Sequence, residues 1–100
     1  MVIQRIVITQ YRGDEDPFLV AWADVYLAGE AFPLRDIRIV READGLQVRL
    51  PRKLSPAAFL QGHHIVESLL EAHRLADGEY PGFEKIEATF SGEQMTLAVP

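Results

Sequence analysis

Apolar and polar residues alternate along residues 18–53, and this alternation predicts three consecutive antiparallel strands. A period of two is typical of a half-buried strand, because successive side chains point to opposite faces. In the first of these strands the residues predicted to face inward are Leu19, Ala21, Ala23, Val25 and Leu27.

The segment 28–31 favours a two-residue turn, with Gly29 at the first central position, where a positive φ is needed. Such a turn would place Leu27 opposite Phe32. It would also place Val25 opposite Leu34, so that the inward faces of the two strands agree.

The apolar phase slips by one residue after Leu34, because the next apolar residues are Ile37 and Ile39. One extra residue at Arg35–Asp36, a β-bulge, restores the phase and keeps both isoleucines inside. Asp44–Gly45 indicates a second turn. The return strand would then direct three residues to the same inner face and end near Pro51: Leu46, Val48 and Leu50.

Three further elements flank this sheet. Residues 2–12 predict a strand that is apolar on both sides, and such a strand lies either in the middle of a sheet or at a subunit interface. Ser55 and Pro56 predict a helix start, Gly78 its end, and Gly62 a kink or a later start near His63. Its apolar stripe comprises Phe59, Val66, Leu69, Leu70 and His73, flanked by Ile65 and Ala76. Residues 83–100 predict a final hairpin that turns at 91–94.

These elements predict one α+β domain over residues 1–100. Its order is β-β-β-β-α-β-β, with an antiparallel sheet packed against one long helix. The 100 residues are 48% hydrophobic, which is ordinary for a globular chain. Cysteine is absent, so disulfides and thiolate metal sites are excluded and a reducing, cytoplasmic location fits. No window approaches the length of a membrane span, so we expect no membrane partner.

Residues 20–53 resemble the core of the stage V sporulation protein G (SpoVG) family, small bacterial septation and sporulation regulators. The features that carry the resemblance are an alternating Ala-rich strand, a short turn, Phe32, the run Asp36–Ile37–Arg38, Gly45, and Pro51 with Lys53 nearby. The resemblance implies a homodimeric antiparallel-sheet protein that binds DNA or RNA and carries no cofactor. The second half departs from the family pattern, which has a further strand before the helix and ends soon after it. This chain instead enters the helix directly and adds two strands.

Charge is distributed unevenly along the chain. The net charge of −5 opposes nonspecific binding to phosphate. Residues 35–53, however, hold six basic and three acidic side chains, a net of +3 that leaves −8 for the remainder.

The predicted register brings Trp22 near Arg38, and sets Arg38 opposite or diagonal to Arg49. Two like charges across a ladder destabilise it unless an anion lies between them, and an indole beside arginine can stack on a base. The candidate nucleic-acid-binding residues are Arg35, Arg38, Arg49, Arg52, Lys53 and Trp22. Two alternatives stay open: the arginines are solvated or pair with acids of a partner subunit, and the sheet serves protein assembly without nucleic acid.

Other chemistry has little support in the sequence. His64, Glu67 and Glu71 share a helical face at spacings that can hold a metal, but no second group of ligands completes a zinc set, so we expect surface ion pairs and no metal. No nucleophile elbow, phosphate loop or catalytic carboxylate pair is present. We therefore expect a non-enzymatic protein without a cofactor or a small-molecule substrate.

Overall fold

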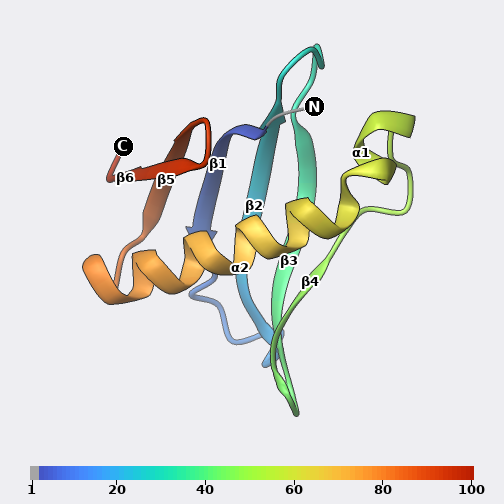
Figure 1. Cartoon of the computed structure of the whole chain (residues 1–100). Helices are drawn as coiled ribbons and strands as arrows, with labels where there is room; N and C mark the ends of the chain where they lie inside the picture. Colours follow the sequence, from blue (N-terminus) through green and yellow to red (C-terminus); the bar gives the residue numbers. More distant parts are fainter. Residues whose placement is uncertain (1–2) are drawn as a thin grey trace.

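The computed structural model describes residues 3–100, in which six strands form one antiparallel sheet and a long helix crosses one of its faces (Figure 1). The elements in chain order are β1 Ile3–Gln10, β2 Leu19–Leu27, β3 Leu34–Glu42, β4 Gly45–Arg49, α1 Pro56–Leu60, α2 Gly62–Glu79, β5 Lys85–Ser91 and β6 Gln94–Ala98. The predicted α+β class, the antiparallel sheet and the single long helix packed against it are confirmed.

The strands lie side by side in the order β4-β3-β2-β1-β5-β6. The predicted two-sided strand, β1, is therefore central, with β2 on one side and β5 on the other. Its face is settled by Ile6 and Ile8, which are fully buried, while Val7 between them points to the other side. Residue 2, which the prediction included in this strand, lies outside the described residues.

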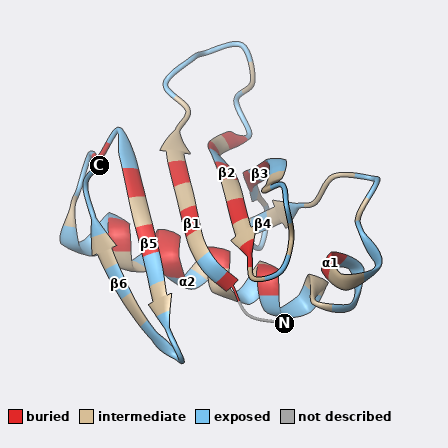
Figure 2. Cartoon of the chain, turned by 90° about the horizontal axis from the view of Figure 1, so that it is seen from above, coloured by how far each residue is buried: buried red, intermediate tan, exposed pale blue. Residues whose placement is uncertain are grey.

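The core lies between α2 and the sheet, where buried residues follow the central strands and the near side of the helix (Figure 2). The helix contributes Ile65, Leu69, Ala72, His73 and Ala76. The predicted stripe was thus displaced by about one position, and its first member was wrong, because Phe59 is 72% exposed. Phe59 belongs to α1, which does not continue the axis of α2 (Figure 1).

The helical segment begins and breaks as its residue types dictate. The Ser55 side chain accepts a hydrogen bond of 3.1 Å from the Ala58 amide, and Pro56 occupies the first turn. The break predicted near Gly62 falls at Gln61, between α1 and α2. Neither helix of residues 3–100 is long and apolar enough to cross a membrane.

The predicted helix end at Gly78 was wrong. The helix passes through this residue to Glu79, and the Tyr80 amide closes it by donating to the Ala76 carbonyl at 2.8 Å. A glycine inside a helix costs up to about 1 kcal/mol but does not forbid it, and core packing around Ala76 offsets that cost. The positive φ needed to turn the chain toward β5 occurs instead at Gly82, where φ is 75°.

The connection from β2 to β3 also differs from the prediction. The Glu30 amide donates to the Leu27 carbonyl at 3.2 Å, so Gly29, with φ of 83°, is the second central residue of the turn. Phe32 is 84% exposed and does not pair with Leu27. The adjacent Pro33 has no N–H to donate to a ladder, and β3 therefore starts only at Leu34.

Beyond that connection the predicted register holds. Val25 pairs with Leu34 and Ala23 with Ile37, so one extra residue lies in β3 between them, and the bulge at Arg35–Asp36 is confirmed. Asp36 has a φ of 61°, the left-handed region in which aspartate is one of the few tolerated residues.

A second register shift lies between Leu19 and Ala21. Leu19 is buried, but it pairs with Val40 away from the main core, while Val20 packs against that core. The predicted burial of Leu19 is thus confirmed, although the residue lies outside the main core cluster.

Candidate nucleic-acid interface

The sheet has two unlike faces, which we call the covered face and the open face. The covered face packs against α2. The open face is turned away from both helices, and its side chains are those that alternate with the buried ones along each strand (Figure 1). Trp22 on β2 and Arg38 on β3 both lie on the open face, because their neighbours Ala21, Ala23 and Ile37 are buried.

The two arginines and the indole lie together as the sequence predicted. Arg38 is the direct ladder partner of Arg49 on β4 and of Trp22 on β2. The guanidinium carbon of Arg38 lies 5.0 Å from the centroid of the Trp22 ring, within the range of a cation–π contact. Trp22 is 37% exposed, so part of the indole remains available to a ligand.

The same line of partners continues across the sheet. Trp22 pairs with Thr9 on β1, and Thr9 pairs with Lys85 on β5. We call this line the cationic row; its members are Arg49, Arg38, Trp22, Thr9 and Lys85. The sequence did not reveal Thr9 and Lys85 as members of this row, because local alternation does not show that β5 pairs with β1.

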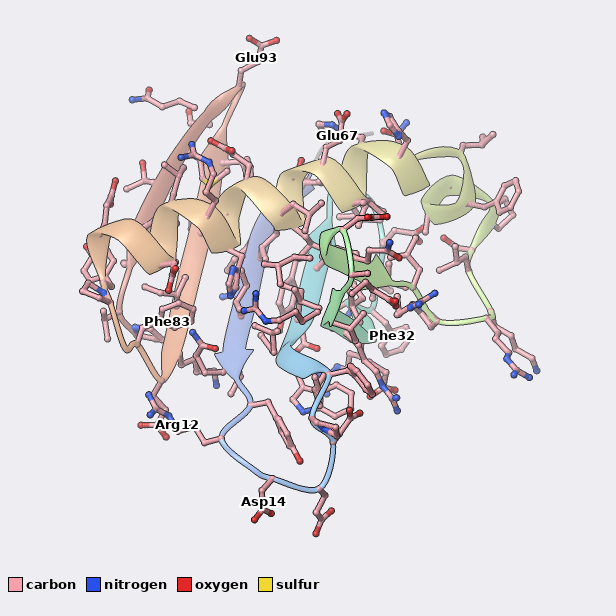
Figure 3. All side chains as sticks on the ribbon, turned by 90° about the horizontal axis from the view of Figure 1, so that it is seen from below. Arg12, Asp14, Phe32, Glu67, Phe83 and Glu93 are labelled. Atoms are coloured by element: carbon pink, nitrogen blue, oxygen red, sulfur yellow. The ribbon has the colours of Figure 1, made fainter. Side chains whose placement is uncertain are left out.

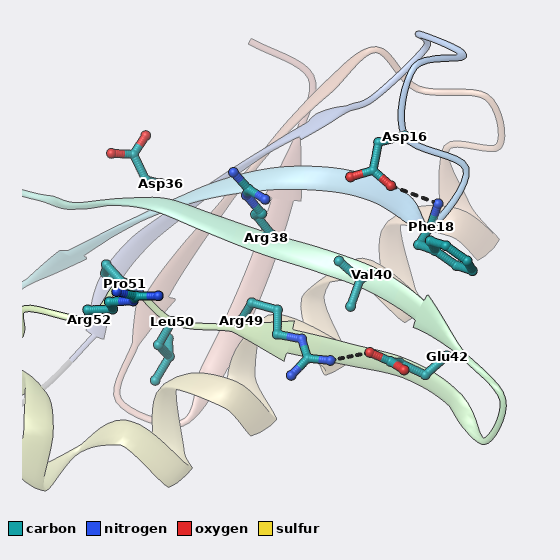
Figure 4. Close-up of a pocket in the computed structure, with 10 residues that line it drawn as sticks. All are labelled: Asp16, Phe18, Asp36, Arg38, Val40, Glu42, Arg49, Leu50, Pro51 and Arg52. Atoms are coloured by element: carbon teal, nitrogen blue, oxygen red, sulfur yellow. Dashed lines mark hydrogen bonds and ion pairs between the residues drawn. The ribbon is translucent and has the colours of Figure 1, made fainter.

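A shallow groove of about 680 Å³ lies at the β4 end of the row (Figure 4). Its walls combine apolar side chains with three arginines and three acids, which are Phe18, Val40, Leu50, Pro51, Arg38, Arg49, Arg52, Asp16, Asp36 and Glu42. The formal charge of this lining is zero, so the groove is not a simple basic pocket, and the partners of each charge decide its chemistry.

Two of the three acids are already engaged. Glu42 forms an ion pair with Arg49 (Figure 4). The Asp16 carboxylate accepts hydrogen bonds from the amides of Phe18 at 3.0 Å and Leu19 at 3.3 Å, and so closes the loop that precedes β2. Within residues 3–100, Arg38 makes no ion pair with a carboxylate. Of the two arginines that face each other across the ladder, Arg49 is therefore neutralised by a carboxylate of the same chain, whereas Arg38 is not.

The remaining predicted residues are more scattered. Arg52 lines the groove from the segment after β4. Arg35, in the bulge of β3, and Lys53, in the loop before α1, are exposed but do not line it. The structure thus brings together four of the six predicted residues, Trp22, Arg38, Arg49 and Arg52.

Surface ion pairs occupy the helical face where the sequence offered metal ligands. His63 Nε2 lies 3.0 Å from a Glu67 carboxylate oxygen, and Arg74 binds Glu71 with a closest distance of 2.6 Å. The hydrogen bond from Arg74 lowers the pKa of Glu71. Glu67 projects outward from α2 and Asp14 lies at the tip of the β1–β2 loop (Figure 3). No cluster of three potential metal ligands occurs within residues 3–100.

Comparisons of the chain with family models, with curated proteins and with solved structures gave no match. The resemblance of residues 20–53 to the SpoVG family therefore stays a prediction.

Proposed function

We propose that the protein is a non-enzymatic bacterial regulator that binds DNA or RNA on the open face of its sheet. The observation that carries the proposal is Arg38, which lies on that face between Trp22 and Arg49 and makes no ion pair with any described carboxylate. Arg49 and Arg52 would add phosphate contacts from the groove, and Arg35 and Lys53 would add charge at its margins.

Arginine at this position suits a phosphate ligand. Like charges directly opposite each other on a ladder are destabilising, and an anion bound between Arg38 and Arg49 would remove that repulsion. A guanidinium can donate two parallel hydrogen bonds to one phosphate. The competing pair between Arg49 and Glu42 is weak, because the two side chains are 58% and 36% exposed and solvent screens them.

The indole supplies the second part of the site. Stacking of a base on an aromatic ring contributes about 1–3 kcal/mol and tolerates any base. The position of Trp22 beside an arginine therefore favours binding with little sequence preference. The net charge of −5 opposes long-range attraction of a polyanion, so we expect modest affinity that is strongest at low salt.

Fluorescence anisotropy of labelled oligonucleotides at several salt concentrations tests the proposal. Arg38→Ala should weaken binding about tenfold, the loss of one charge-assisted contact of about 1.4 kcal/mol. Arg74→Ala is the matched control, since Arg74 is also an exposed arginine but lies on α2 and pairs with Glu71. Absence of binding at low salt, or equal losses in the two variants, would remove the proposal.

The same proposal includes a homodimer located in the cytoplasm. The second candidate function is protein assembly without nucleic acid. What favours assembly is a set of exposed apolar side chains, Phe32 at 84%, Phe59 at 72% and Leu60 at 79%. A hydrogen bond of 2.7 Å from Ser55 Oγ to Glu30 ties the two segments that carry them. Exposed apolar groups of this kind are typical of protein–protein contacts.

Measurement of the molecular mass in solution tests the assembly proposal. The dimer predicts twice the chain mass of 11.3 kDa, and Leu60→Ser should shift the equilibrium toward the monomer. A monomeric parent protein would remove this proposal. A dimer that fails to bind any oligonucleotide would instead favour the assembly module.

A further inference from the structure

We propose that the ligand of the open face is a single strand of nucleic acid that lies along the cationic row, across the β-strands, with Lys85 as its distal contact. This inference depends on the proposed nucleic-acid binding and adds the class of ligand, its path and one further residue.

The row forms a continuous track. Its members come from five neighbouring strands and follow one another as ladder partners from Arg49 to Lys85. Four spacings between adjacent strands give a length of about 19 Å. Three of its five side chains are cationic, a fourth is the indole of Trp22, and the fifth is the hydroxyl of Thr9, which can donate to a phosphate. No acid lies in the row.

A line of acids borders the track on one side, and on the other side Glu42 is paired with Arg49. The next line of open-face partners contains Asp24, Val7 and Glu87, since Val7 pairs with both acids. Asp36, in the bulge beside Arg38, lies on the same side. Two residues along a strand span about 7 Å, so these carboxylates run parallel to the cationic row at that separation.

The width of the track distinguishes a single strand from a duplex. One line of phosphates fits the row, because it meets Arg49 and Arg38 at one end, the Thr9 hydroxyl further along and Lys85 at the other end. A duplex has a second backbone, which lies across a groove about 6 or 12 Å wide. Laid on the row, it would bring that backbone over Asp24 and Glu87 and be repelled.

The indole at the centre of the row points to the same ligand. A base can stack on Trp22 only when it is unpaired and turned toward the sheet, which a single strand allows and an intact duplex does not. The guanidinium of Arg38, 5.0 Å from the ring, would then hold the phosphate next to the stacked base.

Binding of an oligothymidylate of about 20 nucleotides should be compared with that of a duplex of equal length, at about 50–200 mM salt. We expect the single strand to bind at least tenfold more tightly. Each phosphate contact in a single strand contributes about 0.7 to the slope of log K against log salt. Lys85→Ala and Lys85→Gln should each lower that slope by about 0.7, with unchanged melting temperatures.

Arg5→Ala is the matched control on the same face. Arg5 lies outside the row, stacks on Tyr26 at 4.0 Å and lies 3.7 Å from Glu87, so its removal should leave the salt slope unchanged. If neither oligonucleotide binds, the proposed function fails. If the single strand binds but the Lys85 variants keep the parent slope, or the duplex binds as tightly, the function stands and the inference about the row is wrong.

Discussion

The two faces of this sheet are built from the same strands but differ in the burial and the polarity of their side chains. On the covered face, isoleucines of three strands meet α2 with no exposed surface: Ile6, Ile8, Ile37, Ile39 and Ile86. On the open face, charged, polar and aromatic side chains lie in lines across the strands, and one of these lines sets Arg38 directly opposite Arg49.

The difference shows which face sets the register. Full burial of one isoleucine stabilises the fold by about 1.5–3 kcal/mol, whereas like charges on opposed strands cost at most about 1 kcal/mol. The covered face therefore dictates the pairing, and the open face accepts an unfavourable arginine pair. Because the fold does not need the Arg38–Arg49 pair for its stability, this pair is available for binding a ligand.

The largest difference in the free energy of unfolding should appear between substitutions at two adjacent residues of β1, Ile8 and Thr9. Ile8→Ala removes a fully buried side chain and should lower the free energy of unfolding by about 2–5 kcal/mol. Thr9→Ala, on the open face, should change it by less than about 1 kcal/mol. Urea denaturation followed by circular dichroism measures both. Similar losses would mean that the open face also carries the fold.

The bulge is the device that assigns residues of β3 to the two faces. Asp36→Val places a β-branched residue at a φ of 61° and should cost about 1–2 kcal/mol or more. Asp36→Gly should change stability by less than about 1 kcal/mol, since relief of the strained φ and the greater entropy of the unfolded chain offset each other. Equal stability of the valine and glycine variants in urea would show that the bulge is absent.

In the core between α2 and the covered face, His73 of α2 is the one buried titratable group of residues 3–100. Its ring packs edge-on against Phe83 at 6.1 Å, and its Nε2 has no hydrogen-bond partner within residues 3–100. Desolvation lowers the pKa of His73 from the ordinary 6.5; Asp77 opposes this shift, whereas Arg41 adds to it.

Because the pKa of His73 is lower in the folded chain, the unfolded chain binds more protons below pH 6.5. The contribution of neutral His73 to the free energy of unfolding is fully present above pH 6.5 and is lost as the pH falls through the folded pKa. The slope is at most about 1.4 kcal/mol per pH unit. His73→Leu should flatten the dependence of the free energy of unfolding on pH between neutral and acidic conditions. Parallel curves for variant and parent would contradict the assignment.

The smallest effect concerns the ion pair on the open face. Glu42→Gln leaves Arg49 without its carboxylate and should change the free energy of unfolding by less than about 1 kcal/mol. It should raise the affinity for single-stranded oligonucleotide a few-fold, on the order of 0.5–1 kcal/mol, because phosphate no longer competes with Glu42. Weaker binding would show that Glu42 positions Arg49 for the ligand.

Local chemistry allowed the bulge, the Arg38–Arg49 pairing and the Ser55 cap to be predicted. Where one face of a strand is buried, the period of two must be kept, so the slip after Leu34 required an extra residue. The predicted inward positions of Ile37 and Ile39 are confirmed.

The parts that could not be predicted depend on contacts between distant segments or on competing turns. Thr9 and Lys85 enter the site because β5 pairs with β1, and nothing local states which strands are neighbours. Phe32 was expected inside from the predicted turn register, and Phe59 from its helical spacing in the apolar stripe. Pro33 delayed the start of β3, and the break at Gln61 placed Phe59 on a separate short helix.

The most direct measurement of the open face as a ligand site uses Trp22, the single tryptophan of the chain. Titration with oligothymidylate at low salt should quench its fluorescence saturably, in step with the anisotropy of the labelled strand, and added salt should reverse the quenching. If the anisotropy reports binding while the tryptophan emission stays constant, or if neither signal changes, the cationic row is not the binding site.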